Sequence, residues 1–230
     1  QEADIVSITK NITKFSYQIT KFEDIKYILE KSFFIANNWR KWPVLIDIPM
    51  DIQRQDIEEK KLKSFFDSKE YKKNNNYSKN DLLKIIKLIK ESKKPIILAW
   101  WWLKFLKNKW YLTDLVQKLN IPIVSSLMWL DSINHNENNY IWMIWSYWDR
   151  EANIAIMNSD LIFVLGSRLD IRQTWSDKKK FIKNKIIIHI DIDKNELGYN
   201  VKNTQIKINL DLNIFLENFI SIINDKKIII

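Results

Sequence analysis

The sequence predicts an α/β fold, in which a Rossmann-like, doubly wound and mostly parallel sheet is preceded by the tail of another α/β domain. Apolar runs of strand length alternate with segments of helical periodicity from residue 78 onward, and this alternation is typical of a parallel sheet covered on both faces. The chain has 230 residues, enough for more than one domain at about 150 residues each. A polar stretch without periodicity follows residue 50 and separates the two parts.

The first part contains one predicted helix and one predicted strand. Apolar side chains recur at helical spacing over residues 22–38, which predicts an amphipathic helix. Residues 43–49 form an apolar run bounded by Pro43 and Pro49, and this pattern predicts a buried strand. The charged residues that follow are interpreted as an interdomain linker, which ends before Ser78.

The second part begins with a predicted helix cap, because Ser78 and Asp81 have the spacing of a capping box. Strands and helices then alternate. The strands are predicted at 95–99, 122–125, 161–165 and 186–192, and the further helices around 103–119, over 150–158 and over 212–223. In such sheets, ligands bind beyond the carboxyl ends of the strands. The residues at those ends are 100–102, 126–128, 166–168 and Asp191.

The composition excludes several kinds of site. The chain has no cysteine, which excludes disulfides, thiolate metal sites and a cysteine nucleophile. The two histidines, His135 and His189, are far apart in the chain, and His189 alternates with isoleucines as a strand residue does rather than a catalytic one. No apolar run has the length of a membrane span and no signal-peptide core opens the chain, which predicts a soluble, cytoplasmic protein.

The net charge of +9 is typical of nucleic-acid-binding proteins, but its distribution argues against that function. The lysines are spread over segments rich in Asn and Ile, as on solvated faces. The segment 119–177 contains no lysine but three of the five arginines, Arg150, Arg168 and Arg172. A ligand site is therefore expected in this segment.

Glycine and tryptophan have unusual frequencies. The chain has 2 glycines and 11 tryptophans, which together number 13, whereas ordinary usage predicts about 16 glycines. Several tryptophans, such as those at 100–102, stand where a turn needs a residue that tolerates positive φ and lets a backbone approach a phosphate. We interpret these tryptophans as glycines whose UGA codons were translated as tryptophan. The alternative is a genuine tryptophan variant, at a cost of about 1–3 kcal/mol for each strained site.

With glycine at these positions, the chain resembles thiamine-diphosphate-dependent enzymes of the acetolactate synthase type. Residues 40–49, RKWPVLIDIP, are similar to the Gly-Arg-Pro-Gly-Pro-Val-Leu-Ile-Asp-Ile-Pro segment of that family. Residues 94–103, 121–130, 160–175 and 188–193 resemble further motifs of the family in the same order, among them DLIFVLGSRLDIRQTW. The resemblance covers nearly the whole chain.

The resemblance implies a domain organisation and an activity. Residues 1–50 would be the C-terminal part of the N-terminal pyrimidine-binding domain, 51–77 a linker and 78–230 the central domain. The parent enzyme would use thiamine diphosphate and Mg²⁺ to decarboxylate a 2-keto acid and transfer or release the remainder. The catalytic glutamate is expected upstream of Gln1 and the Mg²⁺ motif downstream of Ile230, so this chain alone is expected to be inactive. The parent is expected to be a homodimer or homotetramer, without nucleic-acid or membrane partners.

Acetolactate synthases also hold FAD in the central domain, and the resemblance carries that site onto the strand ends. The residues are Trp100, Trp101, Trp102, Leu127, Met128, Trp142, Met143, Trp145, Gly166, Arg168, Asp170, Arg172, Asp191 and Ile192. Arg168 and Arg172 could bind a pyrophosphate, and Asp191 could accept a hydrogen bond from adenine or ribose. Ile144 stands where these synthases have His, and residues 209–211 where they have Gly-Asp, so FAD, another nucleotide or no nucleotide stay open.

Two other functions also stay open. A free-standing nucleotide-binding α/β domain would need no flanking domains. A basic, aromatic nucleic-acid-binding protein would need the tryptophans to be genuine. Asp170 and Arg172 equally allow a purely structural interpretation, as a local ion pair. The codons at the tryptophan positions discriminate between these functions.

Overall fold

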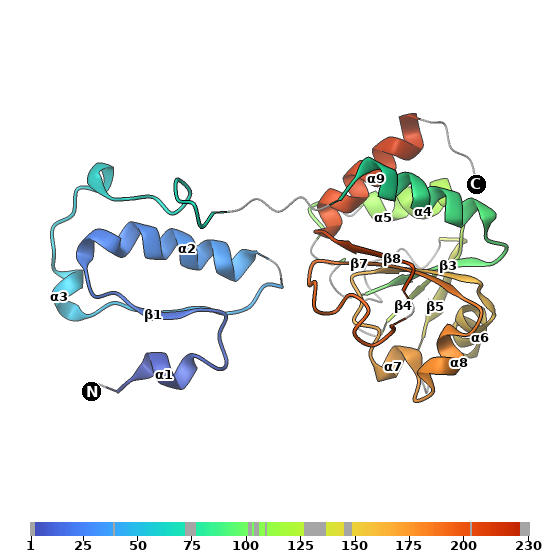
Figure 1. The fold of residues 1–230 in the computed structure, drawn as a ribbon, viewed down its shortest axis with the longest axis horizontal. Coiled ribbons are helices and arrows are strands. Elements are labelled where there is room, and N and C mark those ends of the chain that lie inside the picture. Colours follow the sequence, from blue (N-terminus) through green and yellow to red (C-terminus); the bar gives the residue numbers. More distant parts are fainter. Residues whose placement is uncertain are drawn as a thin grey trace. The chain divides into compact units, whose positions relative to one another are not determined.

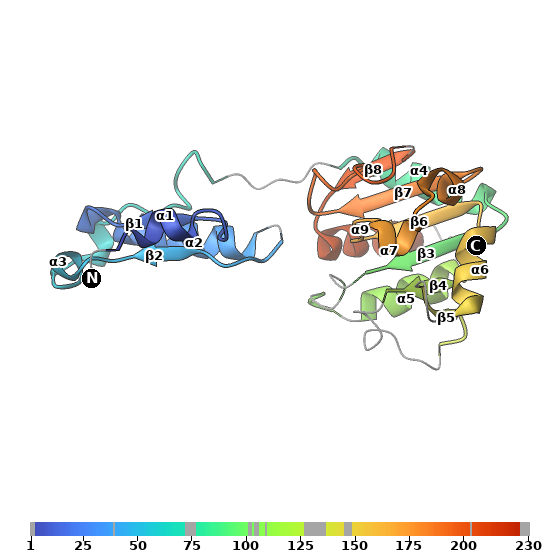
Figure 2. The same cartoon turned by 90° about the horizontal axis from the view of Figure 1, so that it is seen from below.

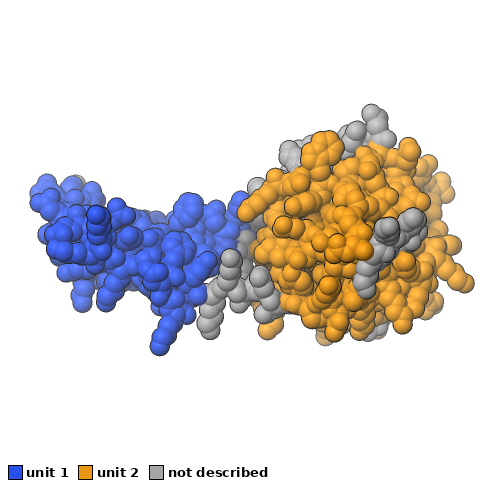
Figure 3. Space-filling model, turned by 90° about the horizontal axis from the view of Figure 1, so that it is seen from above, with its two compact units in different colours: residues 1–74 blue, residues 75–230 orange. Residues whose placement is uncertain are grey.

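The computed structural model describes residues 3–38, 40–71, 77–100, 103, 106–108, 110–126, 137–144, 149–202 and 204–225. The chain divides into two compact units, residues 1–74 and residues 75–230, which Figure 3 shows in different colours. Each unit is described by itself.

The first unit is built on a two-stranded parallel sheet of β1 (Ser16–Gln18) and β2 (Leu45–Asp47). The predicted helix over 22–38 is present as a short turn, η1 (Phe22–Asp24), followed by α2 (Ile25–Asn37). A further helix, α1 (Ile5–Thr9), lies near the amino end. Three isoleucines, Ile19, Ile28 and Ile52, form the small buried core of this unit.

The polar stretch after residue 50 also contributes to the first unit. It contains α3 (Met50–Gln53) and η2 (Glu59–Lys61). Phe65 is only 3% exposed and packs against the rings of Tyr27 and Phe34. Glu30 accepts hydrogen bonds from Ser64 Oγ at 2.7 Å and from the backbone N–H of Phe65 at 2.8 Å. The segment interpreted as a linker therefore contains a buried residue, Phe65, that packs within the first unit. The polar composition of the segment gave no sign of this contact.

Within its described residues, the second unit contains six parallel strands in the order β5-β4-β3-β6-β7-β8. The strands are β3 (Pro95–Ala99), β4 (Ile123–Ser125), β5 (Tyr140–Met143), β6 (Leu161–Leu165), β7 (Ile186–Asp191) and β8 (Ile206–Asn209). Figure 2 shows the strands side by side. This parallel sheet confirms the predicted fold class.

Helices cover both faces of the sheet (Figure 1). One face carries α4 (Lys79–Glu91), α5 (Trp110–Leu119) and α9 (Leu212–Asp225), and the other carries α6 (Arg150–Asn158), α7 (Ile171–Thr174) and α8 (Lys178–Ile182). The predicted capping box is confirmed, because Ser78 and Asp81 exchange side-chain to backbone hydrogen bonds at the start of α4. β6 is buried along its whole length, as a strand covered on both faces must be.

Some predicted boundaries differ from the structure. The helix predicted from about residue 103 begins at Trp110. β5 and β8 were not predicted, and neither were α7 and α8, which have only four and five residues. In β8, burial alternates along the strand in the usual way, but its four residues are too few for a clear period. Along the described parts of the chain, no helix is both long and apolar enough to cross a bilayer.

Candidate functional site

The described strands place a topological switch point between β3 and β6. From β3 the chain builds β4 and β5 on one side, and it then crosses to the other side of β3 to build β6, β7 and β8. In open α/β sheets, the connections diverge at such a point and leave a crevice beyond the carboxyl ends of the two strands. The loops that follow β3 and β6 are therefore the expected walls of a ligand site.

The loop after β6 is tightly held. Gly166 has a φ of +65° and donates its N–H to the carbonyl of Ile190 at 2.8 Å. Ser167 is fully buried, and its Oγ accepts the N–H of Leu169 at 3.1 Å while donating to Gln173 Oε1 at 2.5 Å. Leu169 itself has a φ of +50°. Ordered hydrogen bonds thus maintain a backbone path that a non-glycine residue adopts only at a cost.

This loop places Arg168, Asp170 and Arg172 at the switch-point edge. Arg168 is half-exposed, and its Nε lies 3.3 Å from Glu196 Oε1. Asp170 caps α7, since its Oδ1 accepts the backbone N–H of Arg172 at 2.9 Å. Asp170 therefore has a structural role as a helix cap. Both arginines are exposed residues on the rim of the expected crevice.

Asp191 ends β7 and is fully buried. Its Oδ1 accepts the N–H of Asp193 at 2.8 Å, which shapes the turn after the strand. Asn209 Nδ2 donates to the carbonyls of Asp191 at 3.1 Å and of Ile192 at 2.7 Å. The side chain of Asn209 thereby orients the two predicted ligand-binding residues. Asn209 was not among the predicted site residues, although a polar residue at the end of an apolar strand indicates such a contact.

The strands on the other side of the switch point carry tryptophans. Trp100 follows β3 directly, is half-buried, and accepts the N–H of Leu103 at 3.1 Å through its carbonyl. Trp142 lies in β5 with a φ of +127° and 39% of its surface exposed, next to a register shift opposite Ile123 and Val124. Met143 is buried. The other predicted site residues, Trp101, Trp102, Leu127, Met128 and Trp145, lie outside the described residues.

Two buried polar atoms near this edge lack hydrogen-bond partners within the described part of the chain: Ser126 Oγ, directly after β4, and Gln173 Nε2, in α7. A buried donor without a partner is costly and is commonly satisfied by a ligand or water. Ser126 belonged to the predicted strand ends, whereas Gln173 was not predicted. The sequence offered no signal for Gln173, because its contact with the loop, the hydrogen bond that its Oε1 accepts from Ser167 Oγ, depends on the fold.

The strand next to Ser126 also contains a perturbed phenol. Burial raises the pKa of Tyr140, while the contact of its hydroxyl with Ser125 Oγ, at 2.7 Å, opposes the rise. Tyr140 is therefore neutral at physiological pH, and its hydroxyl joins β4 to β5. This pair stabilises the sheet rather than providing an acid or a base.

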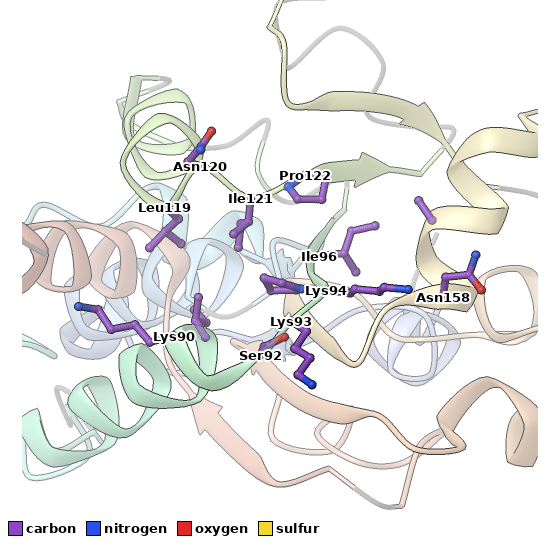
Figure 4. A pocket seen from close by; sticks show the side chains of 13 residues that line it. Lys90, Ser92, Lys93, Lys94, Ile96, Leu119, Asn120, Ile121, Pro122 and Asn158 are labelled. Atoms are coloured by element: carbon purple, nitrogen blue, oxygen red, sulfur yellow. The ribbon is translucent and has the colours of Figure 1, made fainter. Parts of the chain in front are cut away.

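A cavity of about 630 Å³ lies at the opposite edge of the sheet (Figure 4). It is bounded by the amino ends of β3 and β4 and by the carboxyl ends of α4, α5 and α6. Lys90, Lys93 and Lys94 stand around it. Helix carboxyl ends carry partial negative charge that attracts cations, so these lysines have a structural explanation. The cavity is not the site that the switch point predicts.

Among the described residues, no group of three His, Cys, Asp or Glu side chains is arranged to hold a metal ion. The polar groups of the switch-point edge are instead two arginines, a buried aspartate and buried amide and hydroxyl groups. Such groups bind organic anions and sugar hydroxyls.

A parallel, doubly wound sheet with these groups at its switch point defines the class of Rossmann-like binding domains. The family described as "Thiamine pyrophosphate enzyme, central domain" matches residues 82–219. The chain belongs to this family, which confirms the resemblance found in its motifs.

Curated relatives extend the likeness to nearly the whole chain. The acetolactate synthase large subunit of Haemophilus influenzae is 31% identical over 98% of this chain and 39% of its own length. The acetolactate synthase large subunit of Lactococcus lactis is 33% identical over 96% of this chain and 38% of its own length. Acetolactate synthase 2 of tobacco, a chloroplast protein, is 33% identical over 99% of this chain. The chain thus spans about two fifths of the length of these bacterial relatives.

Proposed function

We propose that this chain is part of a thiamine-diphosphate-dependent 2-keto acid decarboxylase or carboligase that resembles the acetolactate synthase large subunit. The match over residues 82–219 carries the proposal. Residues 1–50 would be the end of the pyrimidine-binding domain, 51–77 a linker and 78–230 the central domain. Thiamine diphosphate, anchored by Mg²⁺ in the parts of the enzyme beyond this chain, would supply the electron sink for decarboxylation. The chain alone would then be inactive.

Two features of the first unit support the proposal that the chain is part of a larger protein. A two-stranded sheet is marginally stable by itself, and large apolar side chains of this unit are exposed, including Ile8 at 64%, Ile12 at 65% and Phe33 at 72%. Further parts of the parent, or a second subunit, would cover them. We therefore retain a homodimeric or homotetrameric parent enzyme in the cytoplasm as part of the proposal.

Within the parent, the second unit would hold a nucleotide cofactor such as FAD at its switch-point edge. Arg168 and Arg172 would bind the pyrophosphate, and Asp191 would orient an adenine or ribose group. Ser126 Oγ and Gln173 Nε2, which have no hydrogen-bond partner among the described residues, support a polar ligand there. The indole of Trp100 does not fit a site in which a backbone must approach a phosphate. The residues present therefore fit the group only if position 100 is a glycine.

Replacing Arg168 by glutamine should lower the affinity of the enzyme for FAD about tenfold, because one charge-assisted contact to the pyrophosphate is lost. Flavin released by denaturing the purified enzyme, or flavin fluorescence during titration, measures the effect. Lys90→Gln is the matched control, since it removes one positive charge at the opposite edge of the sheet. Equal affinities for the two variants would refute the site, and absence of flavin from the wild-type parent would refute FAD as its cofactor.

The proposal includes glycine at the tryptophan positions. Trp175 has a φ of +57° and a ψ of −178°, a combination that is essentially restricted to glycine. Trp142 has a φ of +127° at an irregularity between two strands, where glycine is common. Both observations support UGA codons that specify glycine in the natural protein.

The peptide that trypsin releases up to Arg150 tests this interpretation. It begins at Leu119 and contains the tryptophan positions 129, 142, 145 and 148, with no internal Lys or Arg. In protein isolated from its natural source, its mass should correspond to four glycines at these positions, and the DNA should show four UGA codons. A mass that requires four tryptophans, or UGG codons, would refute the recoding.

Genuine tryptophans would favour the second candidate, a basic, aromatic nucleic-acid-binding protein. Trp42 and Trp110 are 59% and 74% exposed, and the net charge is +9, which are the properties of a stacking surface on a cationic protein. Binding to single-stranded DNA that weakens steeply with salt would support this function.

A further inference from the structure

His189 makes a contact that neither the fold nor the proposed chemistry requires of a strand residue. It lies in β7 between two isoleucines and is 1% exposed. Its Nε2 is 2.6 Å from the carbonyl oxygen of Ser167, in the loop that follows the neighbouring strand β6. An apolar residue would fill the same position in a buried strand without this contact.

The chemistry of the contact fixes the protonation of the imidazole. A carbonyl oxygen can only accept a hydrogen bond, so Nε2 must carry the proton and donate it. Ser167 is fully buried, so its carbonyl would have no access to bulk water if His189 were replaced by an apolar side chain. The contact therefore stabilises the conformation of the loop after β6 rather than that of β7 itself.

Ser167, in the loop that carries Arg168, is held by hydrogen bonds at both its carbonyl and its hydroxyl. His189 holds its carbonyl, while its hydroxyl accepts from the N–H of Leu169 and donates to Gln173. In the next peptide unit, the carbonyl of Arg168 accepts from Asn200 Nδ2 at 2.9 Å. Arg168 is thus the exposed residue between two clamped carbonyl groups.

We propose that His189 is a positioning residue, whose Nε2–H holds the Ser167 carbonyl and thereby fixes the direction in which the loop 166–170 presents Arg168 to a nucleotide phosphate. The role of the loop in binding rests on the proposed function. The hydrogen bond from His189 Nε2–H to the Ser167 carbonyl, called the clamp below, does not. His189 does not touch the ligand. It acts through the backbone of Ser167.

The protonation is tested first by nitrogen NMR on the 230-residue chain labelled at histidine. The chain has only two histidines, and the variant His135→Gln assigns their signals. The expected result is a proton on Nε2 of His189 at neutral pH. A proton on Nδ1 alone would overturn the proposal, since Nε2 could not then donate.

Two variants of nearly equal size test the clamp. His189→Gln keeps an N–H donor at the end of the side chain, whereas His189→Met has similar length and no donor. Amide hydrogen exchange should be about tenfold faster at Leu169 in His189→Met and close to wild type in His189→Gln. Ile97, whose N–H donates to Pro122 in the sheet, should exchange alike in both variants. Equal acceleration at Leu169 and Ile97 would indicate a general loss of stability and would overturn the proposal.

Titration of the natural enzyme, in which position 100 would be a glycine, with FAD then connects the clamp to binding. The dissociation constant should rise about tenfold in His189→Met and less than threefold in His189→Gln, as expected for one buried hydrogen bond. Equal affinity of the two variants, with wild-type binding intact, would overturn the positioning role. If the wild-type chain and the parent enzyme both fail to bind FAD, the cofactor proposal fails, while the NMR and exchange results still decide whether the clamp exists.

Discussion

Replacing Asp160 by alanine should lower the free energy of unfolding of the second unit by about 2–3 kcal/mol. Asp160 precedes β6, and its carboxylate accepts hydrogen bonds from the hydroxyl of Ser92, from the N–H of Lys93 at 2.8 Å and from the N–H of Lys94 at 2.9 Å. These contacts join the turn between α4 and β3 to the start of β6. Hydrogen bonds to a charged group are the stronger kind, and removal of the carboxylate leaves the donors without it.

The same contacts predict a dependence on pH. Burial alone would raise the pKa of Asp160, but the hydrogen bonds from Ser92, Lys93 and Lys94 together outweigh it and hold the pKa below its ordinary value of 3.8. A group whose pKa is lowered on folding stabilises the protein above its unfolded pKa, and this contribution is lost as the pH falls through the folded pKa. The difference between wild type and Asp160→Ala should therefore be full at pH 7 and should shrink below about pH 4.

Urea denaturation at pH 7 and again below about pH 4 measures these differences. Asp114→Ala is the control, because Asp114 forms only a partly exposed ion pair with Lys118, and such pairs contribute about 0–1 kcal/mol. If the two variants lost the same stability at pH 7, or if the loss in Asp160→Ala were unchanged in acid, the assigned role of Asp160 would be wrong.

At positions 142 and 175, the glycine variant should have a higher free energy of unfolding than the alanine variant. At position 110, the glycine variant should have the lower one. Both substitutions remove the indole, so its lost contacts cancel in the comparison. At the positive φ values of Trp142 and Trp175, alanine retains the backbone strain and glycine does not, which favours glycine by about 1 kcal/mol or more. Trp110 begins α5, and glycine in a helix costs up to about 1 kcal/mol relative to alanine.

Six single variants, Gly and Ala at each of the three positions, provide the test by thermal or urea denaturation. The expected result is a change of sign between position 110 and the other two. Alanine equal to or better than glycine at all three positions would contradict the backbone argument and weaken the case for recoding. The comparison is independent of the codons, since it examines only whether the folded backbone requires glycine.

The central part of the fold could be predicted from the sequence because burial leaves a strong local signal. β3, β6 and α6 begin and end at the predicted residues. β6 has five consecutive buried apolar residues, a pattern of a strand covered on both faces. β5 was missed because Trp142, one of its four residues, was interpreted as a glycine at a turn; its φ of +127° departs from the regular strand conformation.

The candidate site could be predicted only at the level of strand ends. The switch-point edge follows from the order of the elements, and the family follows from the motifs. The contacts that orient the site do not follow, because they join residues distant in sequence. His189 lies 22 positions from Ser167, and Asn209 lies 17 positions from Ile192. The binding roles of the residues assigned by resemblance stay predictions.

The order of the strands also has a consequence for how the chain folds. β3 and β6 are the innermost pair of the sheet, yet Pro95 pairs with Leu161, so the ribosome must synthesise all of β4, β5 and α6 before they can meet. Such distant pairing delays folding, because a large loop must close before its contacts form. We expect β3, β4 and β5 to associate first during synthesis. The arrival of β6 would then create the crevice, and β7, β8 and α9 would complete the core and supply Asp191, so that a nascent chain becomes competent to bind its ligand only when its central sheet is stable.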